Sequence, residues 1–331
     1  MVTRREVAVR AGVSEATVSN VVNGKSCVSQ DKVKRVYSAM RELGYIPNQN
    51  ARNLVTGRSN HIGIAIYEMT NPYHMEIAQY IERYASRHGY IVSLFLLDNN
   101  MQNKLNAIAQ RRLDGVVNFM TNEYPDQFIE ELTRYNAVMI NFNESVGSMF
   151  VNRYESAMRE LMARTFELGH RKIAYLSSQD EAGFSMDGRG VQWFRSLKEL
   201  PFEKAEVFYN SDFGQMSDKI GYCLAQEMLR RHPDITAVFC TNDLTAFGCI
   251  RALTEAGVKV PEEISVIGCD DIRMSELAML PLTTIGIDKK QQGEDIARQA
   301  IEEIVGSAQR VRKEYVAYPV YRDSLTKCKN T

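Results

Sequence analysis

The sequence has little of the chemistry that metal and redox sites need. Among 331 residues there are six cysteines, five histidines and one tryptophan. No two cysteines have C-x-x-C spacing, and several stand in apolar runs such as AVFCTN, so we expect buried, reduced thiols. The histidines show no H-E-x-x-H or similar spacing. The sequence therefore supports neither a metal site nor a cofactor.

Long apolar runs and catalytic loop motifs are also missing. No run is long enough to cross a bilayer, and the first residues, MVTRREVAVR, carry charges where an export signal needs an apolar segment. This predicts a cytoplasmic protein and argues against an exported binding protein. There is no P-loop, no G-x-G-x-x-G after the first predicted strand and no G-x-S-x-G. An enzyme stays as an alternative only because Asp243, Asp270 and Asp271 could act as acids or bases in a cleft.

The charge is distributed unevenly along the chain. Residues 1–60 hold ten Lys or Arg residues against four Asp or Glu residues, a net charge of +6, whereas the whole chain has a net charge of −1. A basic segment on an acidic body is expected when that segment neutralises DNA phosphates. The competing interpretation is an ordinary solvated surface. It is weakened because the basic segment coincides with a helix-turn-helix pattern.

That pattern is EVAVRAGVSEATVSNVV, residues 6–22, which contains two short helical repeats of apolar residues. Gly12 and Val13 are placed to form the turn, and Ser14 is placed to cap the second helix. The outward face of that helix carries small or polar residues that could enter a DNA groove: Glu15, Ala16, Ser19 and Asn20. A third helix, from Ser29 to Gly44, would close a small core. We predict an all-α headpiece that binds DNA.

Beyond residue 60 the sequence alternates between β-rich runs and segments of helical periodicity. The runs are HIGIAIY, IVSLFLL, GVVNFM and AVMINF, and after Asn152 KIAYLSS, AEVFYN, AVFCTN and SVIGCD. Such alternation predicts doubly wound parallel sheets in two similar lobes.

Several motifs make the chain resemble the lactose-repressor (LacI/GalR) family of bacterial transcription regulators. They are EVAVRAGVSEATVSNVVNG, VSQDKVKRVYSAMRELGYIPNQNARNLVTGRSNHIG, NPY at 71–73, ELGHRKIAYL at 167–176, TNDLTAFG at 241–248, VPEEISVIGCDD at 260–271 and LPLTTIGID at 280–288. The resemblance implies a periplasmic-binding-protein-like α/β core whose two lobes are joined near 151–153, 283–288 and 315–319. The stretch VNRYES departs from it, with Asn152 and Arg153 where the family usually has Asp-Asn.

These patterns predict three parts: a headpiece over residues 1–46, a hinge helix and linker over 47–60, and an effector-binding and dimerisation core over 61–330. Lobe one would comprise about 61–151 and 286–316, and lobe two about 152–285 and 317–330. A hinge helix over 48–56, bounded by Pro47 and Gly57, is too short to be stable alone, so we expect it to form on DNA.

The predicted DNA contacts combine the outward face of the second helix with the hinge. They are Thr3, Ser14, Glu15, Ala16, Thr17, Ser19, Asn20, Asn23, Asn48, Ala51, Arg52 and Leu54. Leu54 matches the leucine of the family's A-R-x-L motif, and the resemblance implies that it wedges into the minor groove. Packing against its own headpiece is the alternative for this side chain.

Parallel sheets bind ligands beyond the carboxyl ends of their strands, which selects the predicted effector contacts. They are Asn71, Tyr73, His74, Phe142, Arg189, Asn242 and Asp270, of which Arg189, Asp270, Tyr73 and His74 also match effector contacts of the family. Hydrogen-bonding groups beside aromatic faces suit a small hydroxylated ligand such as a sugar.

Each of these assignments has a structural alternative. Asn242 could simply cap the helix that follows it, and His74 could be an ordinary histidine. Arg189 could serve only an ion pair with Asp187. Trp193 is better explained by core packing than by ligand stacking.

The function predicted from the sequence is a repressor that binds a pseudo-palindromic DNA operator as a homodimer and responds to a sugar-like effector. Two half-sites are expected because one helix-turn-helix buries too little surface to select an operator. The alternative is a regulator that responds to a non-sugar metabolite or to a protein co-regulator.

Overall fold

The protein is described from a computed structural model. The described residues are 2–22, 27–46, 58–66, 68–97, 104, 108, 111–119, 126–134, 137–141, 146–211 and 215–329. The chain divides into two compact units, Met1–Ser59 and Asn60–Thr331. Among the described residues, no helix combines the length and the apolar character needed to cross a membrane.

In its described residues the first unit is a bundle of three helices, α1 (Arg4–Ala11), α2 (Glu15–Val22) and α3 (Gln30–Leu43). Gly12 ends α1 in the left-handed region at φ 62°, which only glycine adopts readily, and so makes the tight turn into α2. Gly44 ends α3 in the same way at φ 64°. The core is built from small side chains, with Val7, Val18 and Val36 fully buried. The predicted helix-turn-helix pattern is therefore present.

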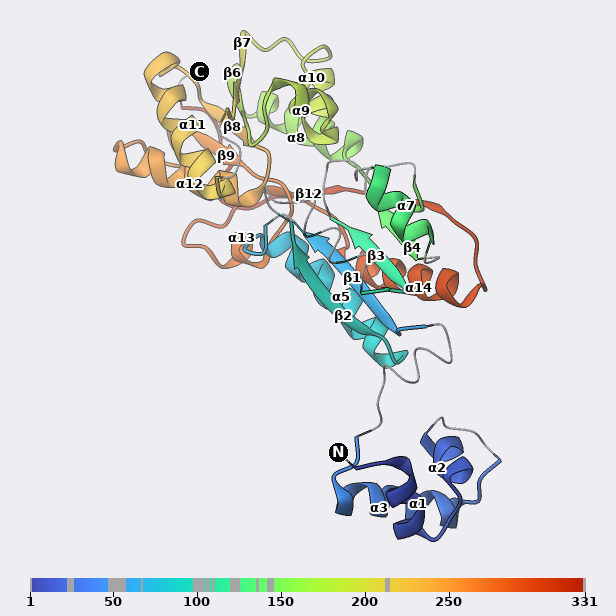
Figure 1. The fold of residues 1–331 in the computed structure, drawn as a ribbon. Coiled ribbons are helices and arrows are strands. Elements are labelled where there is room, and N and C mark those ends of the chain that lie inside the picture. Colours follow the sequence, from blue (N-terminus) through green and yellow to red (C-terminus); the bar gives the residue numbers. More distant parts are fainter. Residues whose placement is uncertain are drawn as a thin grey trace. The chain divides into compact units, whose positions relative to one another are not determined.

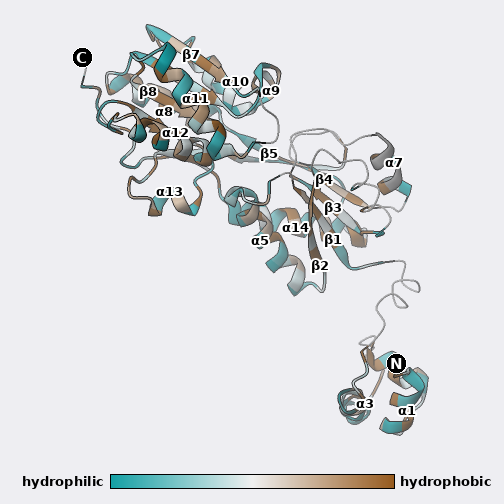
Figure 2. Ribbon diagram, turned by 60° about the vertical axis from the view of Figure 1, so that its left-hand side comes forward, coloured by the Kyte–Doolittle hydropathy of each residue, from teal (hydrophilic) through white to brown (hydrophobic). Residues whose placement is uncertain are grey.

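The second unit contains two lobes (Figure 1). Lobe one has a six-stranded parallel sheet in the order β11-β5-β4-β3-β1-β2. Its strands are β1 (His61–Ile66), β2 (Ile91–Leu96), β3 (Gly115–Asn118), β4 (Val138–Asn141), β5 (Ser148–Arg153) and β11 (Arg312–Val316). Its helices are α5 (Pro72–Arg87), α7 (Asp126–Arg134) and α14 (Lys289–Val305). The central strands β1, β3 and β4 are largely hydrophobic in Figure 2, as expected for strands covered on both faces.

Lobe two has a four-stranded parallel sheet in the order β7-β6-β8-β9. Its strands are β6 (Lys172–Ser177), β7 (Lys204–Tyr209), β8 (Ala237–Cys240) and β9 (Ser265–Ile267). The helices are α8 (Glu155–Glu167), α9 (Glu181–Met186), α10 (Gly188–Ser196), α11 (Ser217–Arg231), α12 (Asp243–Glu255) and α13 (Arg273–Leu277). The chain passes between the lobes after β5, through β10 (Thr284–Gly286), and between β11 and β12 (Tyr318–Val320); β10 and β12 pair antiparallel.

Glycines allow two pairs of helices to approach closely. A Cβ built on Gly293 of α14 would lie 2.9 Å from the carbonyl oxygen of Ile77 in α5, and these two helices lie side by side (Figure 1). Between α11 and α12 the packing is closer still. A Cβ on Gly221 would overlap the backbone of Thr245, and one on Gly248 would overlap the backbone of Asp218.

The prediction of doubly wound parallel sheets is confirmed, and all eight predicted strands are present. The described residues contain four further strands, β5, β10, β11 and β12, which the sequence patterns do not predict. β11 is an edge strand with only Tyr315 buried, so it lacks an apolar run, and β10 and β12 have three residues each. The prediction that the cysteines are buried is confirmed for Cys240, Cys249 and Cys269 but is wrong for Cys27 and Cys223, which are exposed, and for Cys328, which is half-buried. None of the six cysteines, all of which lie in the described part of the chain, forms a disulfide.

Candidate functional site

The headpiece residues predicted to contact DNA divide into capping residues and an open face. Thr3 caps α1, accepting the backbone N–H of Glu6 at 3.3 Å, and its own N–H donates to Glu6 Oε2 at 2.7 Å. Ser14 caps α2 as predicted, because its Oγ accepts the backbone N–H of Thr17 at 3.1 Å. Glu15 and Ala16 are exposed. Ser19 and Asn20 are half-buried on the same helix.

Some predicted contacts lie outside the described residues. They are Asn23, Asn48, Ala51, Arg52 and Leu54 for DNA, together with the predicted hinge helix over 48–56, and Phe142 for the effector.

The lobe-one side of the predicted effector site is the first turn of α5. Asn71 caps this helix, and its Oδ1 accepts the backbone N–H of Tyr73 at 3.1 Å. Tyr73 is buried, and its hydroxyl accepts a hydrogen bond from Asn152 Nδ2 at 2.9 Å. Burial, together with the nearby Asp270 carboxylate, raises the pKa of Tyr73, so the phenol stays neutral.

His74 is held by aromatic neighbours on both sides. Its ring stacks on Phe119 with centroids 5.5 Å apart and 15° between the planes, and it meets Tyr73 edge-on at 5.4 Å. Burial and the positive charge of Arg189 lower the pKa of His74 to about 4, so the imidazole is neutral at physiological pH. Its Nδ1 is buried and has no hydrogen-bond partner among the described residues. Such an atom is costly to bury unless a ligand or water satisfies it.

The lobe-two side is centred on Arg189 in the first turn of α10. Its Nε and Nη2 donate to the two carboxylate oxygens of Asp187 at 2.9 and 2.6 Å, and its Nη1 donates to the carbonyl of Thr241 at 2.9 Å. The ion pair with Asp187 that we considered as an alternative is therefore present. Arg189 Nη1 also lies 3.8 Å from Asp270 Oδ1. Asp187 thus fixes the guanidinium through Nε and Nη2, and Asp270 lies near Nη1.

Asp270 follows β9 and has an unusual backbone. Its φ is 118°, and that of Asp271 is 47°, both in the region that non-glycine residues rarely adopt. Burial raises the pKa of Asp270 well above its usual range, although Arg189 opposes that shift. A buried carboxyl group whose cationic neighbour is already paired with another carboxylate is well placed to take a ligand hydrogen bond.

Asn152 contacts both sides of the site and is itself held by Gln292; neither residue is among the predicted effector contacts. Besides Tyr73, Asn152 Nδ2 lies 3.2 Å from the hydroxyl of Tyr154, and Asn152 Oδ1 accepts from Gln292 Nε2 at 2.8 Å. Gln292 Oε1 is buried and has no partner within the described part of the chain. The departure VNRYES marked Asn152 in the sequence. Gln292 is the fourth residue of α14, where its residue type carries no signal.

Three other residues serve the fold of lobe two. Asn242 caps α12, because its Oδ1 accepts both the backbone N–H and the hydroxyl of Thr245 at 2.8 and 2.9 Å. Asp243, fully buried, accepts from the backbone of Ile272 and from two hydroxyls. Trp193 is fully buried against Tyr175, as core packing predicts, with ring centroids 5.4 Å apart.

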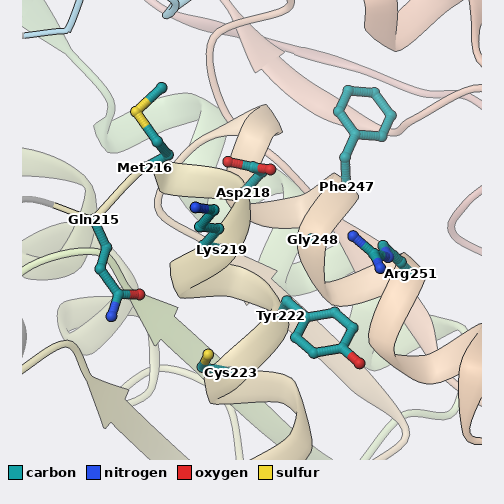
Figure 3. Close-up of a pocket in the computed structure, with 9 residues that line it drawn as sticks. All are labelled: Gln215, Met216, Asp218, Lys219, Tyr222, Cys223, Phe247, Gly248 and Arg251. Carbon is teal, nitrogen blue, oxygen red and sulfur yellow. The ribbon is translucent and has the colours of Figure 1, made fainter.

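A surface hollow of about 520 Å³ lies elsewhere, between α11 and α12. Figure 3 shows Met216, Tyr222, Phe247 and Arg251 around it. None of the predicted effector contacts that the structure describes lines this hollow, so it is distinct from the residues gathered between the lobes.

Comparisons with known proteins agree with this architecture. Residues 3–48 match the model of "Bacterial regulatory proteins, lacI family", and residues 163–325 match that of the "Periplasmic binding protein-like domain". The HTH-type transcriptional repressor PurR of Erwinia tasmaniensis is 32% identical over 97% of this chain and 94% of its own length. PurR of Mannheimia succiniciproducens is 33% identical over 92% of each chain. A structure of the Lac repressor dimer bound to operator and the anti-inducer ONPF is 26% identical, with a TM-score of 0.81 over 98% of this chain and 99% of that one.

Proposed function

Because the chain belongs to the lacI family of bacterial regulatory proteins, we propose that it is a transcription repressor whose affinity for a DNA operator is controlled by a small effector bound between its lobes. The observation that carries the proposal is the convergence of Tyr73 and His74 from lobe one with Arg189 and Asp270 from lobe two. The relatives in this family are transcriptional repressors, and nothing in their names points to an enzyme.

The DNA-binding surface in this proposal is the open face of α2 in a homodimer. One helix-turn-helix makes few base contacts, so two copies on a pseudo-palindromic operator supply the required selectivity. The Lac repressor, a structural relative, binds its operator as a dimer. Sedimentation velocity of the full chain with and without operator DNA tests the stoichiometry, and a monomer that binds a single half-site would refute the dimer.

Asn20 is the proposed base reader within that surface. Its amide can make paired hydrogen bonds to adenine, which discriminate against other bases by about 1 to 3 kcal/mol. Asn20→Ala should therefore relax the preference at one base pair per half-site in an operator selection experiment. Lys32→Ala, which removes an exposed cation, should weaken binding to all sequences alike. An unchanged selection profile for Asn20→Ala would remove it from this role.

The hinge is proposed to act through Leu54. Two short hinge helices could pair in the minor groove, where an apolar side chain inserts between base pairs and kinks the duplex. Leu54→Ala should then reduce DNA bending in a circular-permutation gel shift while leaving effector affinity unchanged. An equal bend in the variant would refute the wedge.

Two effector classes fit the residues between the lobes. A sugar or sugar derivative suits Arg189 and Asp270, which can hold neighbouring hydroxyls as donor and acceptor. A planar heterocycle such as a purine base is favoured by a different observation, the neutral His74 ring stacked on Phe119 with an unsatisfied Nδ1. A protein co-regulator is the remaining alternative.

A thermal-shift panel separates these classes. Ribose, lactose and cellobiose represent the sugars, and hypoxanthine and guanine the heterocycles. An effector that raises the melting temperature of the full chain should also change its operator affinity in a gel shift, because it binds one conformation preferentially. Operator binding that no stabilising compound alters would contradict effector control.

A further inference from the structure

Lys289, at the start of α14, contacts the backbone directly behind the effector candidate Asp270. Its Nζ donates to the carbonyl oxygen of Asp270 at 2.9 Å and also to the carbonyl oxygen of Asp271. The side chain is only 11% exposed. These are the two consecutive residues with positive φ. One ammonium group thus holds both carbonyls of the strained turn.

The lysine belongs to lobe one, whereas the turn belongs to lobe two. Lys289 is the first residue of α14, which packs beside α5, and its Nζ is 3.0 Å from Glu76 Oε2 on α5. The other carboxylate oxygen of Glu76 accepts the backbone N–H of Arg273 at 3.2 Å, three residues beyond Asp270. Lys289 and Glu76 together form a clasp, which we call the Lys289 clasp, from lobe one onto the backbone of residues 270–273.

The placement of this lysine is not explained by helix stability. A cation at a helix N-terminus faces the positive end of the helix dipole, which disfavours it. The capping of α14 is already supplied by Asp288, whose Oδ1 accepts the backbone N–H of Gln291 at 2.8 Å. The contacts that stabilise Lys289 at this position are therefore those with the backbone of lobe two.

The two aspartates of the turn have different partners. The Asp271 carboxylate is paired with Arg322 Nη2 at 2.7 Å, whereas the Asp270 carboxylate points toward Arg189. The clasp uses only their backbone carbonyls, so it leaves the Asp270 carboxylate available for a ligand. Any motion of lobe one relative to lobe two must either move this turn or break the clasp.

We propose that Lys289 is a positioning residue of the effector site, which holds the Asp270–Asp271 turn from the opposite lobe and thereby couples effector contact at Asp270 to lobe closure. This rests on the proposed function in one respect, namely that Asp270 contacts the effector. The clasp requires the two lobes to be close together. If it is lost when they separate, linkage gives the effector a higher affinity for the closed form than for the open form.

The first test needs no ligand. Amide hydrogen exchange of the full-length protein, read by mass spectrometry over residues 268–276, is compared between wild type, Lys289→Met and the matched control Lys290→Met, which removes the neighbouring exposed lysine. We expect exchange in this segment to become about tenfold faster in Lys289→Met, since charge-assisted hydrogen bonds to the turn are lost. It should stay at the wild-type rate in Lys290→Met, and Lys289→Arg should recover part of the protection.

Two results would overturn the positioning role: exchange in Lys289→Met equal to wild type, or exchange accelerated across the whole of lobe two, which would indicate a general structural role.

The coupling is tested with whichever sugar or purine of the panel stabilises the wild-type chain. Its Kd, followed by fluorescence of Trp193, the single tryptophan, should rise about tenfold in Lys289→Met and stay unchanged in Lys290→Met. Local exchange that rises without a change in Kd would refute the coupling. If no compound of the panel binds wild type, the proposed effector classes fail, and the exchange result still decides the role of Lys289.

Discussion

The two lobes supply the effector site with side chains that are held to different degrees. In lobe two, Arg189 is fixed by Asp187 and Asp243 by three donors. In lobe one, Tyr73 and His74 come from the first turn of α5, and His74 keeps a buried nitrogen without a partner among the described residues. In lobe two these side chains are therefore held in place before an effector binds. In lobe one a buried hydrogen-bonding atom remains available to the effector.

The largest expected effect is the loss of stability when the buried Asp243, which organises lobe two, is removed. Asp243→Ala should lower the free energy of unfolding by about 3 to 5 kcal/mol, because three buried donors lose their acceptor. Urea unfolding measures this. Asp234→Ala is the control, since its ion pair with Lys204 lies on the surface and should cost less than about 1 kcal/mol. Equal losses in the two variants would contradict the comparison.

The next effect separates the ligand-facing carboxylate from its neighbour. Asp270→Ala should weaken binding of the effector identified in the panel by about 1 to 3 kcal/mol, because the ligand group that pairs with this carboxyl group is left buried without a partner. Isothermal titration calorimetry gives the affinity. Asp271→Asn should cause a much smaller loss, because that side chain faces Arg322 and an amide oxygen still accepts its hydrogen bond. Full affinity in Asp270→Ala would move the site elsewhere.

The smallest effect sharpens the description of lobe one and depends on pH. The pKa of His74 in the folded protein is about 4, below the value of about 6.5 expected for an unfolded chain. Between these values the unfolded chain binds more protons, so stability falls as the pH drops from about 6.5 to about 4. The loss should reach about 1 to 2 kcal/mol, because His74 is only half-buried and solvent screens part of the effect.

His74→Phe should flatten the pH profile of stability over this window, because it keeps the stack on Phe119 and removes the titration. Chemical unfolding at a series of pH values provides the measurement. His88→Phe, at the other end of α5 where the ring stacks on Tyr84, is the matched control for replacing a histidine by phenylalanine. A wild-type slope in His74→Phe would show that His74 titrates as an exposed histidine.

How far the sequence predicts the molecule depends on how local each feature is. Apolar runs bounded by turn residues predict the central strands, and Gly12 and Ser14 predict the headpiece turn, because these features depend on neighbours along the chain. β11 escapes prediction because its charged residues face solvent at a sheet edge. The sequence also offers Asn242 as the cap of α12, and this capping uses the Oδ1 that a ligand would need.

The unpredicted parts of the candidate site arise from contacts between distant segments. Gln292 meets Asn152 across 140 positions, and Lys289 meets Asp270 across 19. Nothing in the residue type of a glutamine or lysine on a helix indicates which distant backbone it will reach. The only local sign is a lysine pair at the start of α14, where the helix dipole disfavours it.

The contact between α11 and α12 determines how lobe two can move. Since backbone meets backbone at Gly221 and Gly248, the two helices interlock and cannot slide past each other without losing that fit. The two helices therefore form one rigid unit, which we call the α11–α12 lever. Asn242 and Asp243, at the start of α12, lie at the site end of this lever, and the hollow between Met216 and Arg251 lies along its outer side. If the turn next to Asp243 rotates, α11 and α12 therefore move together as a rigid unit. The surface around the hollow is then displaced by the same rotation.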